Sequence, residues 1–203
     1  MIVLVFILNL VVSTINAWGC GKSWTETRVA GGIPHALNWC GAIMAACGFT
    51  WCYLVLIGAF GATVEFEQDD GTMATYLSPE QLEAFANLGY MTIVGPILGS
   101  GLAITVHAWR VAWERRTIGS GAIAAYDTFA MVYNFQSAFE HVPEATSQLR
   151  GFFSSDDDNG KGKVVLLVVL AALAGVVTTY LIISRTAKST ATNRSLRLQN
   201  QLS

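Results

Sequence analysis

The sequence predicts an all-α fold, a polytopic bundle of four to five transmembrane helices, because its charge is low and unevenly spaced. Of the 203 residues, 53% are hydrophobic and only 13% are charged, whereas a soluble domain carries roughly 25% charged residues. Four long segments contain no lysine, arginine, aspartate or glutamate: 1–21, 29–64, 84–109 and 164–184. A transmembrane helix needs about 20 apolar residues, so three of these segments are long enough and the first is at the limit.

The first apolar segment, residues 1–17, has two interpretations. It has the apolar core of a secretory signal, with Ala17 at a candidate cleavage point. Against a signal, no lysine or arginine precedes the core, and Ile15 occupies a position where a small residue is usual. The other interpretation is a retained span. The chain thus divides into this N-terminal hydrophobic helix, a membrane helical bundle over 18–184 and a basic C-terminal tail over 185–203.

Small residues mark the second and third spans. A polar connector is expected over 18–38, followed by a span over 39–64, and the third span covers 88–113. Lipid gives helices no hydrophobic reason to associate, so close contact between backbones through small residues becomes more important. These faces could serve contacts within the bundle or with a partner subunit, and the sequence leaves both alternatives open. The predicted helix-packing residues are Gly41, Ala45 and Gly48 on the second span and Gly95, Gly99 and Gly101 on the third.

An acidic loop, residues 65–86, separates these two spans and contains six acidic and no basic side chains. Ser78 and Pro79 predict a helix start within it, with Ser78 as the N-cap and Pro79 as the first helical residue. Pro96 then lies inside the third span and should kink it, because proline removes a backbone donor.

The third span ends among tryptophans and arginines, which are typical of a membrane–water interface. Positively charged loops tend to remain on the cytoplasmic side, which places this end and the basic tail inside and the acidic loop outside. Two inside segments must be separated by an even number of crossings. Because 164–183 is one crossing, the ambiguous stretch 117–139 is expected to be the other. The predicted interface anchors are Trp109, Arg110, Trp113, Arg115 and Arg116.

The same rule assigns the remaining segments. It places the 18–38 connector inside, which favours retention of residues 1–17 over cleavage. It also predicts a polar loop over 141–163 on the outer side, between the fourth span and the last one.

Asp127 is the most informative single side chain, because an ionisable group at membrane depth is costly and usually faces protein or water. It lies near the middle of the stretch 117–139. His107, Asn134 and Gln136 are the other polar side chains that could line the same intramembrane site. Such a site could handle a proton or an ion. The alternatives are a buried aspartate that hydrogen-bonds a neighbouring helix, or an interfacial helix with Asp127 among the headgroups.

Metal, haem and disulfide chemistry find little support in the sequence. Cys20, Cys40, Cys47 and Cys52 form no C-x-x-C pair, and we interpret them as small buried hydrophobic side chains. Only one histidine lies inside a span, so paired axial haem ligands are not expected. No cofactor is predicted, although bound lipid is expected. The net charge of −2 provides no basic field for nucleic acid.

The leading functional hypothesis is non-enzymatic. The sequence contains no nucleophile elbow, phosphate-binding glycine loop or zincin helix, and its polar segments are too short for a soluble catalytic domain. We therefore expect an integral, multi-pass structural, assembly or accessory subunit of a larger membrane complex, such as an energy-transducing or secretion assembly or a viral envelope. Its partners would be the bilayer and other membrane-protein subunits, in a homo- or hetero-oligomer. The alternative is a small oligomeric channel or transporter with a polar path near Asp127.

Overall fold

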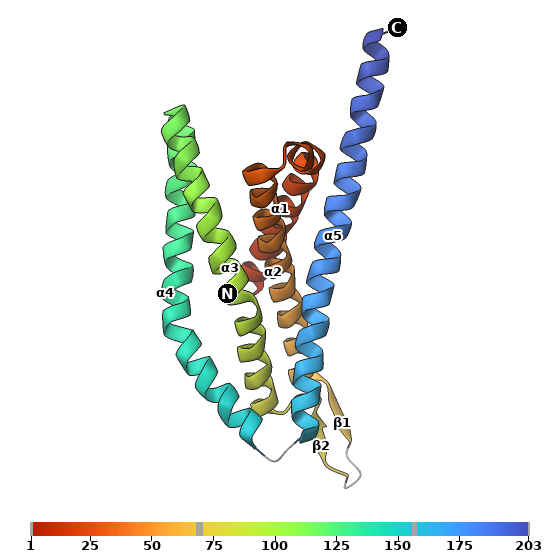
Figure 1. Ribbon diagram of the computed structural model, residues 1–203. Coiled ribbons are helices and arrows are strands. Elements are labelled where there is room, and N and C mark those ends of the chain that lie inside the picture. Colours follow the sequence, from red (N-terminus) through yellow and green to blue (C-terminus); the bar gives the residue numbers. More distant parts are fainter. Residues whose placement is uncertain (1, 68–70, 156–157, 203) are drawn as a thin grey trace.

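Five helices make up nearly all of the computed structural model, which describes residues 2–67, 71–155 and 158–202 (Figure 1). The all-α fold class is therefore confirmed. Four of the described helices are long and apolar enough to cross a membrane, namely α1, α2, α3 and residues 160–193 of α5. The elements are α1 (Ile2–Ala30), α2 (Gly32–Thr63), β1 (Glu65–Glu67), β2 (Met73–Thr75), α3 (Pro79–Arg115), α4 (Ile118–Ser154) and α5 (Asp158–Leu202).

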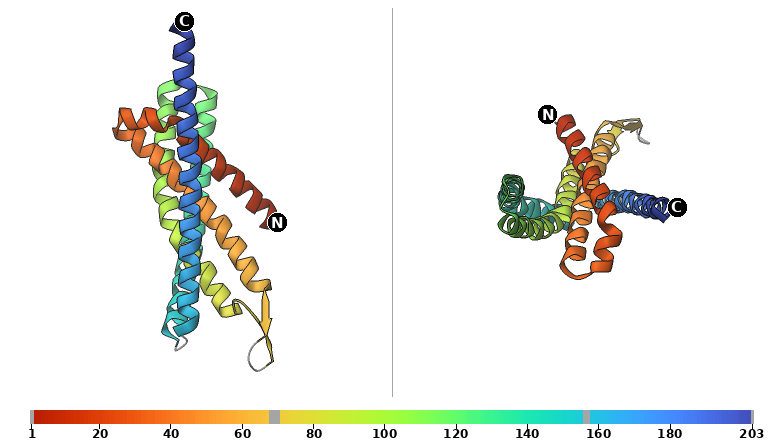
Figure 2. Two further views of the ribbon diagram at one scale, coloured as in Figure 1. Left: turned by 90° about the vertical axis from the view of Figure 1, so that its right-hand side faces the viewer. Right: turned by 90° about the horizontal axis from the view of Figure 1, so that it is seen from above.

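The helices alternate in direction along the bundle (Figure 1). The α1–α2 turn, the α3–α4 turn and the C-terminal part of α5 lie at one end, while the antiparallel β1–β2 hairpin, the end of α4 and the start of α5 lie at the other. Helix α2 contacts α1, α3 and α5, whereas α4 packs along α3 at the edge of the molecule (Figures 1 and 2). The bundle is therefore organised around α2.

The start of α3 agrees with the prediction. Ser78 Oγ accepts a hydrogen bond from the backbone N–H of Gln81 at 3.2 Å, and the backbone N–H of Ser78 donates to Gln81 Oε1 at 3.3 Å. This reciprocal pair is a capping box, and Pro79 follows at the first helical position. Leu77, just before it, is 1% exposed, and its backbone N–H donates to the Gly61 carbonyl at 2.9 Å. The hairpin therefore folds back on the end of α2.

The polar connector expected over 18–38 is wrong, because α1 continues to Ala30 and α2 begins at Gly32. The chain reverses at Gly31 and Gly32, whose φ angles of 62° and 54° lie in the left-handed region that glycine adopts at little cost. Two adjacent glycines thus join the helices without a loop.

Asn38 of α2 holds the two helices together across this turn. Its side-chain amide donates to the Cys20 carbonyl at 3.2 Å and to Thr27 Oγ1 at 3.1 Å, and its carbonyl accepts from Ser23 Oγ at 3.1 Å. Asn38 is buried, and a buried amide is stabilising only when its donors and acceptor are satisfied. We call these three bonds the Asn38 clamp. They give polar groups of this segment hydrogen-bond partners between the two helices, so the segment can be helical despite its polar residues.

Residues 2–17 are continuous with the rest of α1. The helix passes through Ala17, the candidate cleavage point, which is fully buried. Ala17 packs in a cluster with Ala42, Ala45 and Phe49 of α2. Cleavage after Ala17 would therefore remove the buried residues Ser13 and Ala17 of α1 from the bundle.

The polar loop expected over 141–163 is wrong for its first part, because α4 continues to Ser154. Buried and half-buried positions of α4 recur alternately at three and four residues, the spacing of a helix that lays one face along another. Contact with α3 therefore keeps α4 helical even through Pro143. These positions are Ala124, Thr128, Met131, Phe135, Ala138, Val142, Ala145, Leu149 and Phe152.

The stretch 117–139, expected to cross the membrane, lies within this helix. Its 37 residues correspond to about 55 Å, so α4 has sufficient length. It is nevertheless not one of the four helices apolar enough to qualify on composition. Crossing by α4 stays a prediction.

Glycines let neighbouring helices approach α2 closely. Gly89 of α3 faces Leu54 of α2, and a Cβ at position 89 would lie 2.7 Å from Leu54 Cδ1. Gly175 of α5 faces the backbone of α2, where a Cβ would lie 2.7 Å from the Thr50 nitrogen and 2.8 Å from the Ala46 carbonyl oxygen. Backbone atoms cannot move aside as a side chain can, so position 175 requires glycine.

We predict that Gly175→Ala destabilises the bundle by about 1–3 kcal/mol, the usual cost of overpacking, because the added methyl group meets the backbone of α2. The measurement is the thermal midpoint of the detergent-solubilised protein, followed by size-exclusion chromatography after heating. The matched control is Gly95→Ala, since position 95 has open space around its missing Cβ. Equal midpoints for the two variants would contradict this packing of α5 on α2.

Candidate functional site

The two ends of the bundle differ in charge. The end formed by the α1–α2 turn, the α3–α4 turn and the last part of α5, here the basic end, carries nine of the twelve lysines and arginines. The opposite end, here the hairpin end, includes the glutamates of the segment 65–83 and those at 140 and 144. This is the asymmetry that the positive-inside rule describes. The basic-end cations are Lys22, Arg28, Arg110, Arg115, Arg116, Arg185, Lys188, Arg194 and Arg197.

The predicted tryptophan anchors lie at the basic end. Trp109 and Trp113 are 52% and 77% exposed, and Trp109 Nε1 donates to Thr128 Oγ1 at 2.8 Å. On α1, the Lys22 ammonium lies 3.6 Å from the centre of the Trp18 ring. Exposed indoles beside cations suit the headgroup layer, where one part of the ring is apolar and its N–H needs a partner.

The three predicted arginine anchors are also exposed at this end. Arg110 Nε donates to Glu114 Oε1 at 2.8 Å, one helical turn away, and the Arg116 guanidinium lies 5.8 Å from the centre of the Trp113 ring. Arg115 lines a pocket between α3 and α4. The anchors therefore form one exposed basic and aromatic surface.

The structure brings together two of the four residues of the predicted polar site. His107 of α3 and Asp127 of α4 line one pocket of about 310 Å³, with Arg115, Thr117 and Ser120 as its other polar residues. A carboxylate, an imidazole and a guanidinium can together bind a small ion or exchange a proton. Among the described residues, no cluster of histidine, cysteine, aspartate and glutamate could hold a metal ion.

Asn134 and Gln136 do not line this pocket. Gln136 is exposed, and its Nε2 donates to Glu140 Oε1 at 3.1 Å along α4. Asn134 is half-buried on the same helix. The sequence grouped these residues with Asp127 because they are close along the chain. Gln136, nine residues on, lies on the opposite side of α4, whereas Asn134, seven residues on, shares the face of Asp127 but lies about 10 Å further along the helix.

The depth of Asp127 also differs from the expectation. It is the tenth residue of a helix of 37 that begins at the basic end, so it lies in the first third of α4 and not at its middle. Thr105 Oγ1 donates to its backbone carbonyl at 3.3 Å, and the neighbouring Thr128 binds Trp109. Asp127 is thus at the level of an interfacial tryptophan, where a carboxylate is less costly than in hydrocarbon.

The predicted small-residue faces have different environments. A Cβ at Gly41 would lie 2.7 Å from Cys20 Sγ, and one at Gly48 would lie 3.2 Å from Ser13 Cβ, so these glycines contact α1. Ala45 is fully buried, and Gly101 faces Met131 of α4. Gly95 and Gly99 have open space around them, so this G-x-x-x-G face has no neighbour within the described chain.

Sequence reasoning missed the outer face of α4. Opposite the face on α3, this helix exposes a row of large aromatic and aliphatic side chains at 60% to 72% of their surface. The alternation of three and four residues over 124–152 could have revealed both faces. The residues of the outer face are Tyr126, Phe129, Val132 and Tyr133.

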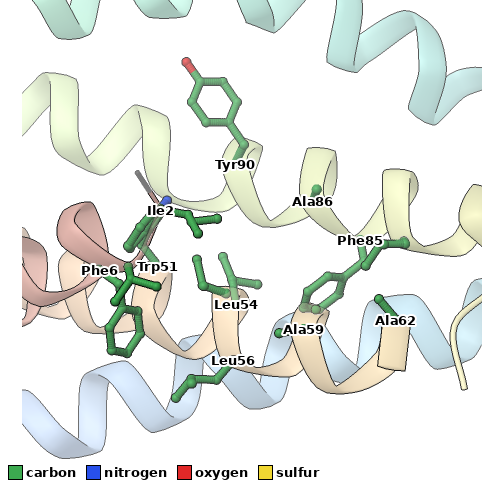
Figure 3. A pocket seen from close by; sticks show the side chains of 14 residues that line it. Ile2, Phe6, Trp51, Leu54, Leu56, Ala59, Ala62, Phe85, Ala86 and Tyr90 are labelled. Atoms are coloured by element: carbon green, nitrogen blue, oxygen red, sulfur yellow. The ribbon is translucent and has the colours of Figure 1, made fainter. Parts of the chain in front are cut away.

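One groove on the bundle is almost entirely apolar. It has a volume of about 600 Å³ and lies between the start of α1, α2 and the first part of α3 (Figure 3). Leu54 and Phe85 lie between α2 and α3, whereas the Tyr90 ring points toward α4 (Figure 3), 6.1 Å from the His141 ring. Acyl chains could fill such a groove, and no charged side chain lines it to select one ligand.

The cysteines are free in the described structure. Cys20, Cys47 and Cys52 are buried and Cys40 is half-buried, and Cys20 Sγ donates to the Asn38 carbonyl at 3.4 Å. Their positions fit the interpretation as small apolar side chains in helix contacts.

No family model, curated protein or solved structure matches this chain. The charge, the helix faces and the grooves are therefore the basis on which a function can be assigned.

Proposed function

We propose that this protein is an integral, multi-pass membrane protein that serves, without enzymatic activity, as a structural or assembly subunit of a larger membrane complex. The observation that supports this most is the position of α4. It is the helix least suited to lipid, and yet it lies at the edge of the bundle, with α3 as its main neighbour.

The outer face of α4 has the composition of a protein contact. Phe129 and Tyr133 are 72% and 66% exposed, and Gln136 is exposed one turn beyond them. Aromatic side chains are enriched where proteins bind one another, and large exposed apolar patches on proteins mark interaction sites. A tyrosine hydroxyl needs a hydrogen-bond partner that acyl chains do not have, and a helix of another subunit would supply one.

The outer face of α5 provides the contrast. Between residues 166 and 177 its large exposed side chains are aliphatic, and Leu166, Val169, Leu173 and Val177 are each about half exposed; Tyr180, at 67%, follows on the same face toward the basic end. Such a face is satisfied by lipid. Two exposed helix faces of the same chain are thus suited to different surroundings.

In this proposal the first helix is retained. Ala17 is buried against α2, and the basic end that contains the α1–α2 turn faces the cytoplasm. The hairpin end then lies on the opposite side, with α1, α2, α3, α4 and α5 all crossing.

A second candidate function is a small oligomeric channel or transporter. The pocket shared by His107, Asp127 and Arg115 favours it. It lies at the basic end only, so a conducting path would need to be completed by further copies of the chain.

The proposed topology predicts how single cysteines react with a membrane-impermeant maleimide. Met73→Cys on the hairpin and Ser154→Cys at the end of α4 should react in intact cells. Arg115→Cys and Ser189→Cys at the basic end should react only after permeabilisation. The unmodified chain is the control for its native cysteines, and carbonate-washed membranes should retain the protein.

Labelling of positions 115 and 154 from the same side would contradict the crossing by α4. Release of the chain by carbonate would contradict the membrane location altogether.

The partner surface predicts the loss of co-purifying subunits when the outer face of α4 is truncated. Phe129→Ala with Tyr133→Ala should lower partner recovery in mild detergent at least tenfold, since removal of one interface hot spot costs about 2 kcal/mol or more. Quantitative mass spectrometry of the tagged chain measures this recovery. The control is Leu173→Ala with Val177→Ala, which have the same spacing on α5 and similar exposure.

Equal recovery from both double variants, with both still monodisperse, would count against a partner on α4. Loss from the α5 variant alone would place the partner elsewhere.

The channel alternative predicts ion flux from liposomes that contain only the purified protein. Asp127→Asn should abolish this flux, because it removes the carboxylate of the shared pocket. Glu144→Gln, which removes an exposed carboxylate from the same helix outside the pocket, should leave the flux unchanged. Absence of flux from the unmodified protein would eliminate this candidate.

A further inference from the structure

A second groove opens between α2 and α3 toward the basic end. It has a volume of about 480 Å³. Its walls are aliphatic, with Ile33 and Leu37 from α2 and Leu102 and Val106 from α3. Ile33 and Val106 are 60% and 63% exposed, so the groove is open to whatever surrounds the bundle.

The groove has direction, because α2 and α3 run antiparallel. Ile33 and Arg110 line its outer part, and Cys40 and Gly99 line its inner part. Gly99 and Arg110 are eleven residues apart, which corresponds to about 16 Å along α3. At Gly99 nothing lies within 4 Å of the missing Cβ, so the inner part has room for an extended hydrocarbon chain.

Polar groups gather only at the outer part of this groove. Arg110 and His107 both line it and both are exposed. Arg110 uses its Nε for Glu114, which partly offsets its charge, while a guanidinium carries four further N–H donors. A phosphate is the group that such a fork binds best.

The charge around the groove is also mainly positive. The basic end holds nine cations against three acidic residues, Glu26, Glu114 and Asp127. Trp109 and Trp113 lie on α3 beside Arg110, at the level expected for headgroups. Helix α2 also begins here, and its positive end has no side-chain cap at Gly31.

We propose that this groove is a binding site for an anionic phospholipid. The phosphate lies beside Arg110 and His107, and one acyl chain follows the aliphatic walls toward Gly99. Charge complementarity selects the headgroup, and the walls accept any acyl chain. The site rests on the membrane location proposed above, but it does not depend on the partner surface of α4.

The test is native mass spectrometry of the purified full chain, titrated in detergent with phosphatidylglycerol or with phosphatidylcholine of the same acyl chains. Phosphatidylglycerol should bind more tightly. Arg110→Gln should weaken that binding about fivefold, the factor expected for one basic residue at an anionic surface. Arg115→Gln, which removes a neighbouring charge outside the groove, should have a clearly smaller effect.

A second pair of variants tests the apolar part without removing charge. Gly99→Leu fills the inner groove and should lower the binding of phosphatidylglycerol. Gly95→Leu adds the same side chain one turn away, at a position that does not line the groove, and should not. A phosphatidylglycerol with a diazirine on its acyl chain should crosslink to peptides within 33–40 and 99–106.

Equal affinity for the two lipids, unchanged binding by Gly99→Leu, or crosslinks confined to other helices would each overturn the site. If any of these results is found while the single-cysteine variants react with maleimide as the topology predicts, the lipid site is refuted and the membrane location still holds. Thermal midpoints of all four variants confirm that they remain folded.

Discussion

Close approach of backbones at α2 is the constraint on which the rest of this bundle depends. Each of its three helical neighbours meets it at a glycine: Gly48 of α2 itself toward α1, Gly89 of α3, and Gly175 of α5. In lipid, where apolar side chains gain nothing by leaving acyl chains for one another, packing at short range and hydrogen bonds must hold helices together. The glycines bring whole helix surfaces into contact, and the Asn38 clamp adds the hydrogen bonds.

The contact between α2 and α3 covers only part of α3. Leu82, Phe85 and Gly89 lie near α2 in the first part of the helix, while Gly95 and Gly99 have no neighbour. Pro96 lies between these two regions. Beyond it α3 follows α4 away from the bundle centre (Figure 1). This divergence opens the groove toward α2 and leaves the outer face of α4 without cover, so both proposed binding surfaces have one geometric origin.

Much of this architecture could be predicted from local sequence. Uncharged segments of sufficient length indicated the apolar helices, and Ser78 with Gln81 formed the predicted cap, because both signals depend on neighbouring residues alone. The connector over 18–38 was misread because its polar side chains are satisfied across a turn, by an asparagine up to 18 residues away. The second half of α4 was expected to be a polar loop because it contains charged residues. In the structure these charged side chains are exposed, while the residues between them contact α3 at every third or fourth position.

The candidate site was predicted only in part, for a similar reason. His107 and Asp127 lie on different helices, and their shared pocket depends on the register of α3 on α4. That register is set by the residues that face each other, such as Gly101 and Met131. Gln136, although close to Asp127 along the chain, points to the opposite side of the helix, and Asn134 lies two turns further along it. Proximity in sequence is therefore a poor guide to proximity around a helix.

The loop-free reversal at Gly31 and Gly32 has a consequence for biogenesis. With no polar loop between them, α1 and α2 would leave the ribosome as one hairpin, already tied by the bonds of Asn38 to Cys20 and Thr27. Such a hairpin can partition from the translocon into lipid as a pair, with its basic turn on one side of the membrane. The later helices would then assemble on a template that is complete before α3 is synthesised.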